Sequence, residues 1–539
     1  MSAAFVGPCS RASSHAQLSP EWVDLARRLG TEQTIQTHIS WVMLGPTDVY
    51  KRKRPVELGF LDFRTLAARR AACQAEVVLN RRLSTDVYIG VKPVTRRPDG
   101  TLELAGGGEV VDWMVHMRRL RDHDRADVRL REGRLTASDL ARVAARLVRF
   151  HDRAPADEHA AAFGHPDRIA RNVRENFAQT RDIVEHFIDA KEYEQIEDHQ
   201  LGFLERHHDV FMSRVQQGRI REGHGDLRLE HVYLPDQGPL QIIDCIEFNE
   251  RFRFGDVASD LAFLVMDLAE HGRVDLAEHF AASYSQDSGD YGIYEVLDFY
   301  EGYRAYVRGK IAALSAQDPS LERTQRDRSA AAARHYFLLA LASARRPIIE
   351  PKVVAVGGMI ATGKSTVAQR LARLLSAPIV EADRTRKQML GVAPAQPIHD
   401  AAWGGAYDPA FTDRVYEEVL RRAAVVLDSG RSVVVDASFR GRTLRQRVRQ
   451  LASDHGVGFR FVECRAPAAV CKQRLRERAK HASVSDGRLE IFDDFASRWE
   501  PVDELSPPEH IVLDTVGPAT EQLEQLRRAV DPWAGDIRP

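Results

Sequence analysis

The sequence reads VVAVGGMIATGKSTVAQRLARLL from residue 353 to residue 375, and this stretch decides the fold of the C-terminal part of the chain. The apolar run Val353–Val356 predicts a buried strand. Val367, Leu371 and Leu375 recur at helical spacing and predict an amphipathic helix shortly after it. A strand followed closely by a helix is the basic unit of an α/β domain with a parallel sheet.

A phosphate-binding loop joins this strand to this helix. The pattern G-x-x-x-x-G-K-[ST] is matched by Gly358, Gly363, Lys364 and Ser365, and Thr366 comes next. Glycines let backbone N–H groups surround an anion, and the helix N-terminus adds partial positive charge. In such a loop the lysine reaches the β- and γ-phosphates of ATP, and the serine hydroxyl binds Mg²⁺. We therefore expect a P-loop domain that binds ATP and Mg²⁺ through these five residues.

A carboxylate follows the next predicted strand, Pro378–Glu381. Asp383 should emerge at the sheet edge that carries the phosphate loop, where open α/β sheets bind their ligands. There it would accept the proton of a substrate hydroxyl during attack on the γ-phosphate. Arg386 could hold an anionic part of that substrate. Alternatively, Asp383 caps the helix that begins there.

Two later segments add candidates for the same site. A buried strand in RSVVVDASF ends at Asp436, which would hold the metal through water or else cap a helix. After a strand at Phe461–Cys464, a helix over 468–480 carries Arg474 and Arg478. These arginines would clamp the phosphate in transfer, or they form a solvated basic face.

The bulk composition is that of a soluble protein with several domains. The chain has 539 residues, with 44% hydrophobic and 29% charged residues and a net charge of −2. That charge gives no basic field for nucleic acid, and the five scattered cysteines indicate neither zinc nor a disulfide framework. Residues 1–20 lack an apolar signal region and predict a flexible tail. No apolar run is long enough for a membrane span, so a cytoplasmic location is expected.

The N-terminal part begins with a predicted hairpin, HISWVMLGPTDVYKRKRPV, at residues 38–56. Lys51 and Lys53 share one face of its second strand. A helix is predicted from Thr65 to Leu83, and Glu76 lies on its apolar face. Because an unpaired buried carboxylate is costly, a strand lysine is the natural partner of Glu76, unless Glu76 is solvated at the edge of that face.

A second polar cluster is predicted further along, after a buried strand at 110–117 and a largely helical region at 156–222. Two short strands flank the turn PDQGP at 235–239 and would pair as a hairpin. His231 at the start of one strand would then face Asp244 at the end of the other, with Asp226 close by. An acid beside metal ligands is the arrangement that phosphoryl transfer requires.

These segments resemble the aminoglycoside phosphotransferase and choline kinase family. HGDLRLEH at 224–231 resembles its H-G-D-x-x-x-x-N loop, IDCIEF its I-D-x-x-E segment, and GDVASDLA its G-D-P-x-x-D-L-A segment. The resemblance implies an α+β, protein-kinase-like domain. It further implies that Asp226 is the catalytic residue near the substrate hydroxyl and that Asp244 is a metal ligand. Lys51 would be the ATP-positioning lysine, and Glu76 its helix partner.

The sequence departs from that family at one ligand position. His231 stands where the family has asparagine. Mg²⁺ prefers oxygen ligands, whereas an imidazole suits softer ions, so Mn²⁺ is the expected metal if His231 is a ligand. A pseudokinase domain that binds ATP without turnover is the alternative.

The C-terminal part resembles small P-loop kinases of the zeta-toxin, gluconate-kinase and polynucleotide-kinase types. The whole chain resembles bacterial fusions of an aminoglycoside-phosphotransferase-like domain with a P-loop ATPase domain. The predicted organisation is a tail at 1–20, a kinase-like domain at 21–345, a linker at 346–351 and a P-loop domain at 352–539.

The expected function is ATP-dependent transfer of phosphate to a hydroxyl of a small molecule, by one or both domains. The alternatives are a polynucleotide 5′-hydroxyl kinase, which the near-neutral charge disfavours, and a non-catalytic ATP-binding regulator, which His231 favours. No motif identifies the acceptor or the oligomeric state.

Overall fold

A computed structural model describes residues 18–59, 61–319, 321–343, 350–398, 400, 403–481 and 483–530. The chain folds as two compact units. The first comprises the described residues up to Ala277 and those from Val296 to 343. The second comprises Glu278–Glu295 and the described residues from 350 onward. Residues 1–17 of the predicted tail and 346–349 of the predicted linker lie outside the described residues.

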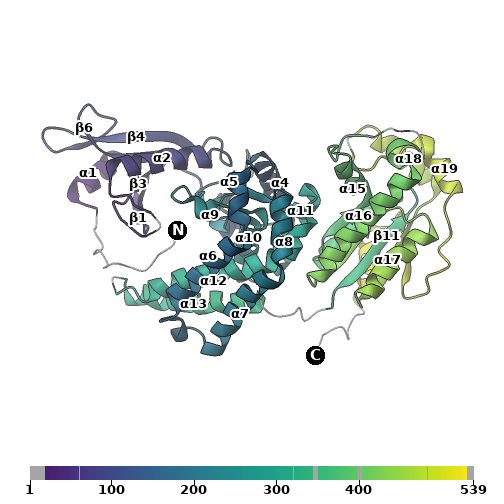
Figure 1. The fold of residues 1–539 in the computed structure, drawn as a ribbon. Coiled ribbons are helices and arrows are strands. Elements are labelled where there is room, and N and C mark those ends of the chain that lie inside the picture. The colour runs from purple at the N-terminus through teal and green to yellow at the C-terminus, as the bar shows by residue number, and fades with distance from the viewer. Residues whose placement is uncertain are drawn as a thin grey trace. The chain divides into compact units, whose positions relative to one another are not determined.

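The first unit contains a six-stranded antiparallel sheet in the order β1-β2-β3-β6-β4-β5 (Figure 1). The predicted hairpin is confirmed, because β2 and β3 pair with Val42 opposite Lys51. The strand predicted at 110–117 is β6, which spans two further residues. The strands are β1 Gln33–Gln36, β2 Ser40–Leu44, β3 Asp48–Lys53, β4 Tyr88–Arg96, β5 Leu102–Leu104 and β6 Glu109–Arg118.

Helix α2 (Leu66–Asn80) packs against β6 and β4 of this sheet (Figure 1). The Thr65 side chain caps it by accepting a hydrogen bond from the Ala68 N–H, so the predicted start is confirmed. The helix ends three residues before the predicted Leu83. Smaller ladders follow, of which β8 (Val232–Tyr233) and β9 (Gln241–Ile242) form the second predicted hairpin and β7 (Ile220–Glu222) pairs with β10 (Phe254–Asp256).

The remainder of the first unit is mostly helical, as predicted for 156–222. Helix α12 packs along α10 and α13. Within the described part of the chain, no helix combines the length and apolar character needed to cross a bilayer. The helices are α1 Pro20–Arg28, α3 Ala126–Arg131, α4 Ala137–Arg153, α5 Glu158–Ala161, α6 Pro166–Thr180, α7 Ala190–Arg206, α8 His208–Gln216, α9 Glu250–Arg253, α10 Val257–Glu270, α11 Val274–Ser288 (whose last turns belong to the second unit), α12 Leu297–Ala316 and α13 Arg323–Ser343.

The second unit contains a five-stranded sheet in the order β12-β13-β11-β14-β15, with every neighbouring pair parallel. The parallel α/β fold predicted from the phosphate-loop stretch is confirmed. The register places Asp436 opposite both Val356 and Glu381. The strands are β11 Lys352–Gly358, β12 Ile379–Glu381, β13 Val433–Asp436, β14 Gly458–Arg465 and β15 His510–Asp514.

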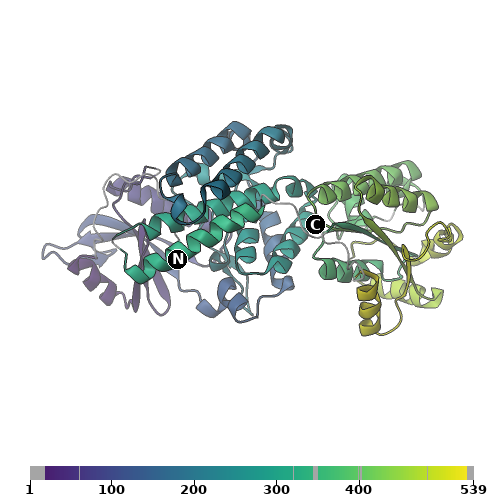
Figure 2. The same ribbon diagram turned by 90° about the horizontal axis from the view of Figure 1, so that it is seen from below.

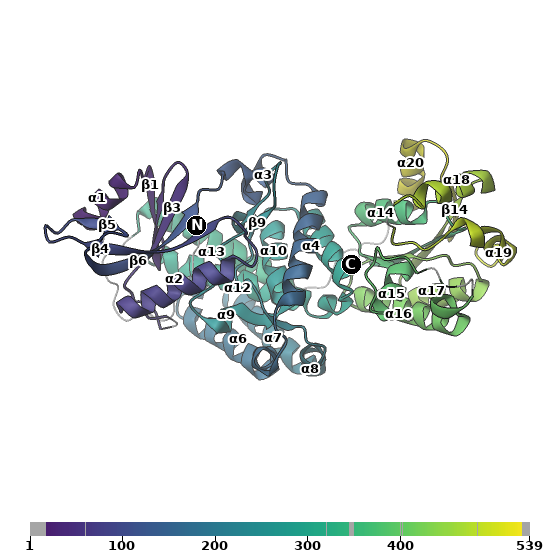
Figure 3. The ribbon, with the colours of Figure 1, turned by 90° about the horizontal axis from the view of Figure 1, so that it is seen from above.

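Helices cover both faces of this sheet, with α14 and α20 on one face and α16 and α17 on the other (Figures 2 and 3). Val354 and Val434 are fully buried beneath them, as a strand covered on both faces requires. The helices are α14 Lys364–Leu375, α15 Ala382–Met389, α16 Pro409–Asp428, α17 Arg442–Asp454, α18 Ala468–Arg478, α19 Phe492–Ser497 and α20 Ala519–Val530.

Candidate functional site

The phosphate loop connects β11 to α14, as predicted. Gly358 has φ +141°, and a Cβ at this position would lie 2.4 Å from the Cys464 carbonyl oxygen, so only glycine fits. Gly363 is the N-cap of α14, with φ +93°. The Lys364 ammonium donates to the Met359 carbonyl oxygen at 2.9 Å. The lysine side chain therefore folds back onto the loop, at the Met359 carbonyl.

Hard oxygen donors meet beside this loop. Ser365 and Asp436 both line the cavity next to the loop, and the serine hydroxyl favours the charged form of the Asp436 carboxylate. Burial, followed by the charge of Glu381, raises the pKa of Asp436 to about 7. The carboxylates of Asp436 and Glu381 and the hydroxyl of Ser365 form a donor set that suits Mg²⁺. A divalent cation would relieve the repulsion between the two carboxylates.

The capping interpretation of Asp436 is wrong. The next helix along the chain, α17, begins at Arg442 and has Gly441 as its N-cap. Asp436 instead ends its strand, as predicted, at the carboxyl edge of the parallel sheet.

A cavity of about 410 Å³ opens beyond the phosphate loop. Asp383 and Arg386 line it together with Lys364. Asp383 lies in the first turn of α15, but the N-cap of that helix is Glu381. Capping therefore does not account for Asp383. Burial raises its pKa, although the positive charges of Arg386 and Lys364 oppose that shift.

The two arginines predicted to clamp phosphate lie in different places. Arg478 lines the cavity and donates to the Gly487 carbonyl oxygen at 2.6 Å. Arg474 donates to the Thr515 carbonyl oxygen at 2.8 Å and to the Ala361 carbonyl oxygen of the phosphate loop at 3.3 Å. Arg474 thus links the phosphate loop to the segment after β15.

Several cavity residues were missed in the sequence analysis, among them Glu381, Trp403 and Arg440. Glu381 ends β12 directly before Asp383, and its position at a strand end was an available signal. Trp403 and Arg440 also line the cavity. They come from connecting segments whose patterns carry no recognisable motif, so no signal in the sequence identified them.

In the first unit, a buried ion-pair network joins the sheet to α2. Lys51 contacts Glu76 at 2.9 Å and Asp244 at 2.6 Å. The predicted pairing of Glu76 with a strand lysine is therefore present. Lys53, fully buried, contacts Glu76 at 2.6 Å and also pairs with Glu247. Two lysines thus offset three carboxylates in this network.

Asp226 is ion-paired within its own loop. The Arg228 guanidinium approaches its carboxylate at 3.0 Å. Burial opposes the charged form, but Arg228 and then His231 hold the pKa of Asp226 well below its usual range. Asp226 is therefore a carboxylate at neutral pH, but a partly neutralised one.

The predicted pairing of His231 with Asp244 needs a correction. The ladder places Val232 opposite Ile242, and the Ile243 N–H donates to the His231 carbonyl oxygen at 3.0 Å, so His231 pairs with Ile243. Asp244 is one residue further on, with φ +65°. This left-handed turn brings its carboxylate within 3.6 Å of the His231 imidazole.

Two carboxylates on α10 hold the 224–231 loop in place. Asp260 accepts hydrogen bonds from the His224 and Gly225 N–H groups at 2.6 and 2.8 Å. Asp267 accepts from the Leu229 N–H at 2.8 Å. These positioning residues were missed, although Asp260 falls within the quoted segment GDVASDLA.

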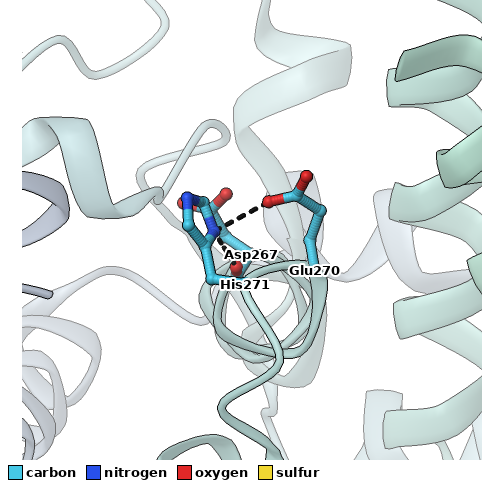
Figure 4. Close-up of side chains that lie close together, drawn as sticks. All are labelled: Asp267, Glu270 and His271. Atoms are coloured by element: carbon cyan, nitrogen blue, oxygen red, sulfur yellow. Dashed lines mark hydrogen bonds and ion pairs between the residues drawn. The ribbon is translucent and has the colours of Figure 1, made fainter. Parts of the chain in front are cut away.

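Asp267 also lies near Glu270 and His271, three residues that could in principle share a metal ion (Figure 4). The Nδ1 atom of His271 lies 2.7 Å from the Glu270 carboxylate and 2.8 Å from the Asp267 carbonyl oxygen. The hydrogen bond to Glu270 raises the pKa of His271 to about 9, so at neutral pH both ring nitrogens carry protons and neither has a lone pair for a metal. The group is therefore a set of hydrogen bonds that fixes the end of α10.

Sequence comparisons relate the chain to one family model over part of its length and to mycobacterial proteins over most of it. A family model described as an AAA domain matches residues 353–502, the core of the second unit. The "Uncharacterized protein Rv2004c" of Mycobacterium tuberculosis H37Rv is 32% identical over 493 residues, covering 91% of this chain and 93% of that protein. The Mycobacterium bovis protein Mb2027c matches with the same figures.

Several solved structures are similar to about a third of this chain. A gluconokinase from Sinorhizobium meliloti covers 35% of this chain and 95% of its own, with 21% identity and a TM-score of 0.25. The Mycobacterium tuberculosis APS kinase CysC, in complex with AMPPNP and APS, covers 34% and 99%, with 19% identity and a TM-score of 0.26.

Proposed function

The chain belongs to the family of the Mycobacterium tuberculosis protein Rv2004c, and we propose that its P-loop unit is an ATP-dependent phosphotransferase. The proposed reaction moves the γ-phosphate of ATP to a hydroxyl group of a small molecule. One observation carries this proposal: the phosphate loop, the Ser365–Asp436 pair and Asp383 all line one cavity. A nucleotide, a metal and a hydroxyl acceptor can therefore meet there.

Each residue has a distinct role in this proposal. Lys364 and the loop N–H groups hold the β- and γ-phosphates. Ser365 and Asp436 would hold Mg²⁺, which supplies charge neutralisation between the phosphates when bound. Asp383 accepts the acceptor's hydroxyl proton as the oxygen attacks phosphorus, and the γ-phosphate leaves the ADP oxygen. Burial raises the pKa of Asp383 toward neutral pH. A general base is most effective when its pKa is close to the working pH.

Phosphate transfer from γ-labelled ATP to a library of hydroxyl-bearing metabolites tests the proposal with the full chain. We expect label on a small-molecule acceptor, and its loss in Lys364→Ala. The matched control is Lys472→Ala, because Lys472 is a half-exposed lysine that pairs with Asp493 away from the cavity. Transfer that persists in Lys364→Ala contradicts the assignment to the P-loop site.

The first unit supports a second candidate function, nucleotide binding without transfer. Asp244 and Asp226, the implied metal ligand and catalytic residue, are already paired with Lys51 and Arg228. A metal would have to compete with a buried ammonium at 2.6 Å from Asp244. Asp226→Ala separates the possibilities, because it removes this unit's own transfer if the unit is catalytic and leaves total transfer unchanged if it is not.

A further inference from the structure

A small cavity in the first unit lies beside the loop that carries Asp226. Its volume is about 50 Å³, and Gly223 and Asp260 are among the residues that line it. Asp260 holds this loop by accepting from the His224 and Gly225 N–H groups. A buried water needs about 10–15 Å³ of such space, so the cavity has room for a few waters or for one small oxyanion.

One face of α12 supplies hydrogen-bond donors to this cavity. Tyr300, Tyr303 and Arg304 are spaced three and four positions apart, so they share one side of the helix, and all three line the cavity. They are only 4%, 9% and 6% exposed. Neither tyrosine hydroxyl has a hydrogen-bond partner among the described residues. Burial holds the pKa of Tyr300 well above its ordinary value, so its hydroxyl is protonated and able to donate.

Arg304 adds a positive charge that pairs with no carboxylate in the part of the chain that the structure describes. Its Nε atom donates to the Ser259 carbonyl oxygen at 3.2 Å, and its Cζ atom lies 4.7 Å from the centroid of the Phe263 ring. An aromatic ring offsets part of a guanidinium charge but uses none of its N–H groups. Within the described ranges, neither Nη atom of Arg304 has a partner, so both retain the capacity to donate to a ligand.

The two carboxylates that line the cavity already have partners. Asp256 accepts from the Arg214 guanidinium, with the Nη2 atom at 2.7 Å. Asp260, besides its bonds to the loop, lies 3.3 Å from the Nε2 atom of His151. Arg221 also lines the cavity, and its printed donors go to carbonyl oxygens, not to a carboxylate. The cavity therefore keeps an excess of positive charge from its arginines.

A buried guanidinium without a negative partner is costly. That cost falls when a ligand supplies charged oxygen atoms, and the planar fork of arginine matches carboxylate and phosphate oxygens. We propose that this cavity binds the oxyanion group of a small ligand, a phosphate or a carboxylate, through Arg304 and the hydroxyls of Tyr300 and Tyr303. This site belongs to the first unit and does not depend on phosphate transfer by the P-loop unit.

Calorimetric titration of the full chain tests this site. The protein is first saturated with Mg²⁺ and a non-hydrolysable ATP analogue, which fills the phosphate loop, and is then titrated with inorganic phosphate or with acetate. We expect saturable binding of at least one of these anions. Arg304→Gln should weaken that binding by about ten- to a hundredfold, and Tyr303→Phe by about tenfold, because each removes a hydrogen bond to a charged group. The anion that binds more tightly shows whether the ligand carries a phosphate or a carboxylate.

Arg328→Gln is the control variant, because Arg328 is exposed on α13 and does not line the cavity. Tyr303→Phe removes a hydroxyl that makes no hydrogen bond within the described residues, so it remains informative if Arg304→Gln does not fold. The inference is overturned if neither anion binds. It is also overturned if a folded Arg304→Gln binds the anion as tightly as Arg328→Gln does, or if Tyr303→Phe does so where Arg304→Gln does not fold.

Discussion

Replacement of Asp383 by asparagine is the sharpest test of the proposed chemistry. Asparagine has nearly the same shape and keeps an oxygen that accepts hydrogen bonds, but it cannot accept a proton. Loss of a general base lowers turnover by roughly 10²–10⁴-fold. At 1.36 kcal/mol per factor of ten, this corresponds to about 2.7–5.4 kcal/mol of transition-state stabilisation. ATP affinity should be unchanged, because the phosphate loop is intact.

The pH dependence of turnover adds a second measure of the same residue. Burial raises the pKa of Asp383 above the ordinary value of 3.8. A base acts only when ionised, so wild-type turnover should fall as the pH drops through this raised pKa. The acid limb should therefore lie at higher pH than an ordinary aspartate would give, and it should disappear in Asp383→Asn.

Steady-state kinetics with the acceptor found in the transfer screen, together with calorimetric ATP binding, measure both effects. Asp408→Asn is the matched control, because the Asp408 side chain caps α16 by accepting from the Ala410 N–H at 2.9 Å. Asparagine caps about as well as aspartate, so this variant should be nearly silent. Near-normal turnover of Asp383→Asn with an unchanged acid limb would refute the role of Asp383 as the base.

Three further predictions concern other parts of the chain. Lys364→Ala should remove nearly all nucleotide binding by the second unit. Because Lys51 is the lysine implied for ATP binding in the first unit, tight ATP binding that survives replacement of both Lys364 and Lys51 would contradict this. If the first unit transfers phosphate, Mn²⁺ should support it better than Mg²⁺, and His231→Asn should raise the Mg²⁺-dependent rate; lower rates with both metals would show that His231 has another role. The hydrogen bond to Glu270 raises the pKa of His271 from 6.5 to about 9, so its stabilising contribution is fully present below pH 6.5 and is lost as the pH rises through 9. The difference in urea midpoint between wild type and His271→Gln should therefore shrink between those pH values, and a constant difference would contradict it.

Local patterns in the sequence were sufficient to predict the elements of the P-loop unit. The strand, the loop and the helix from 353 to 375 follow one another without a break, and each is specified by residues within a few positions. The pairing of Glu76 with a strand lysine was also predicted, because a carboxylate on an apolar helix face requires a partner. These predictions needed no knowledge of distant contacts.

Side chains far apart in sequence could not be placed in this way. The predicted register of the β8–β9 hairpin differs from the observed one by one residue. A left-handed turn at Asp244, and not strand pairing, brings its carboxylate to His231. Lys53 was identified only as a neighbour of Lys51, and its pairing with Glu247 depends on how the loop after β9 folds back onto the sheet.

The sequence by itself determined that a phosphate loop stands between a strand and a helix, because glycine flexibility and hydrophobic periodicity act over a few residues. Only the tertiary structure decided what surrounds that loop. Glu381 and Asp436 meet because β12 and β13 are neighbours in register. Arg386 and Arg440 line one cavity because α15 and the segment after β13 both follow strands at the same edge of the sheet. Parallel strand order and packing set these neighbours, and both arise from contacts between residues that the sequence keeps far apart.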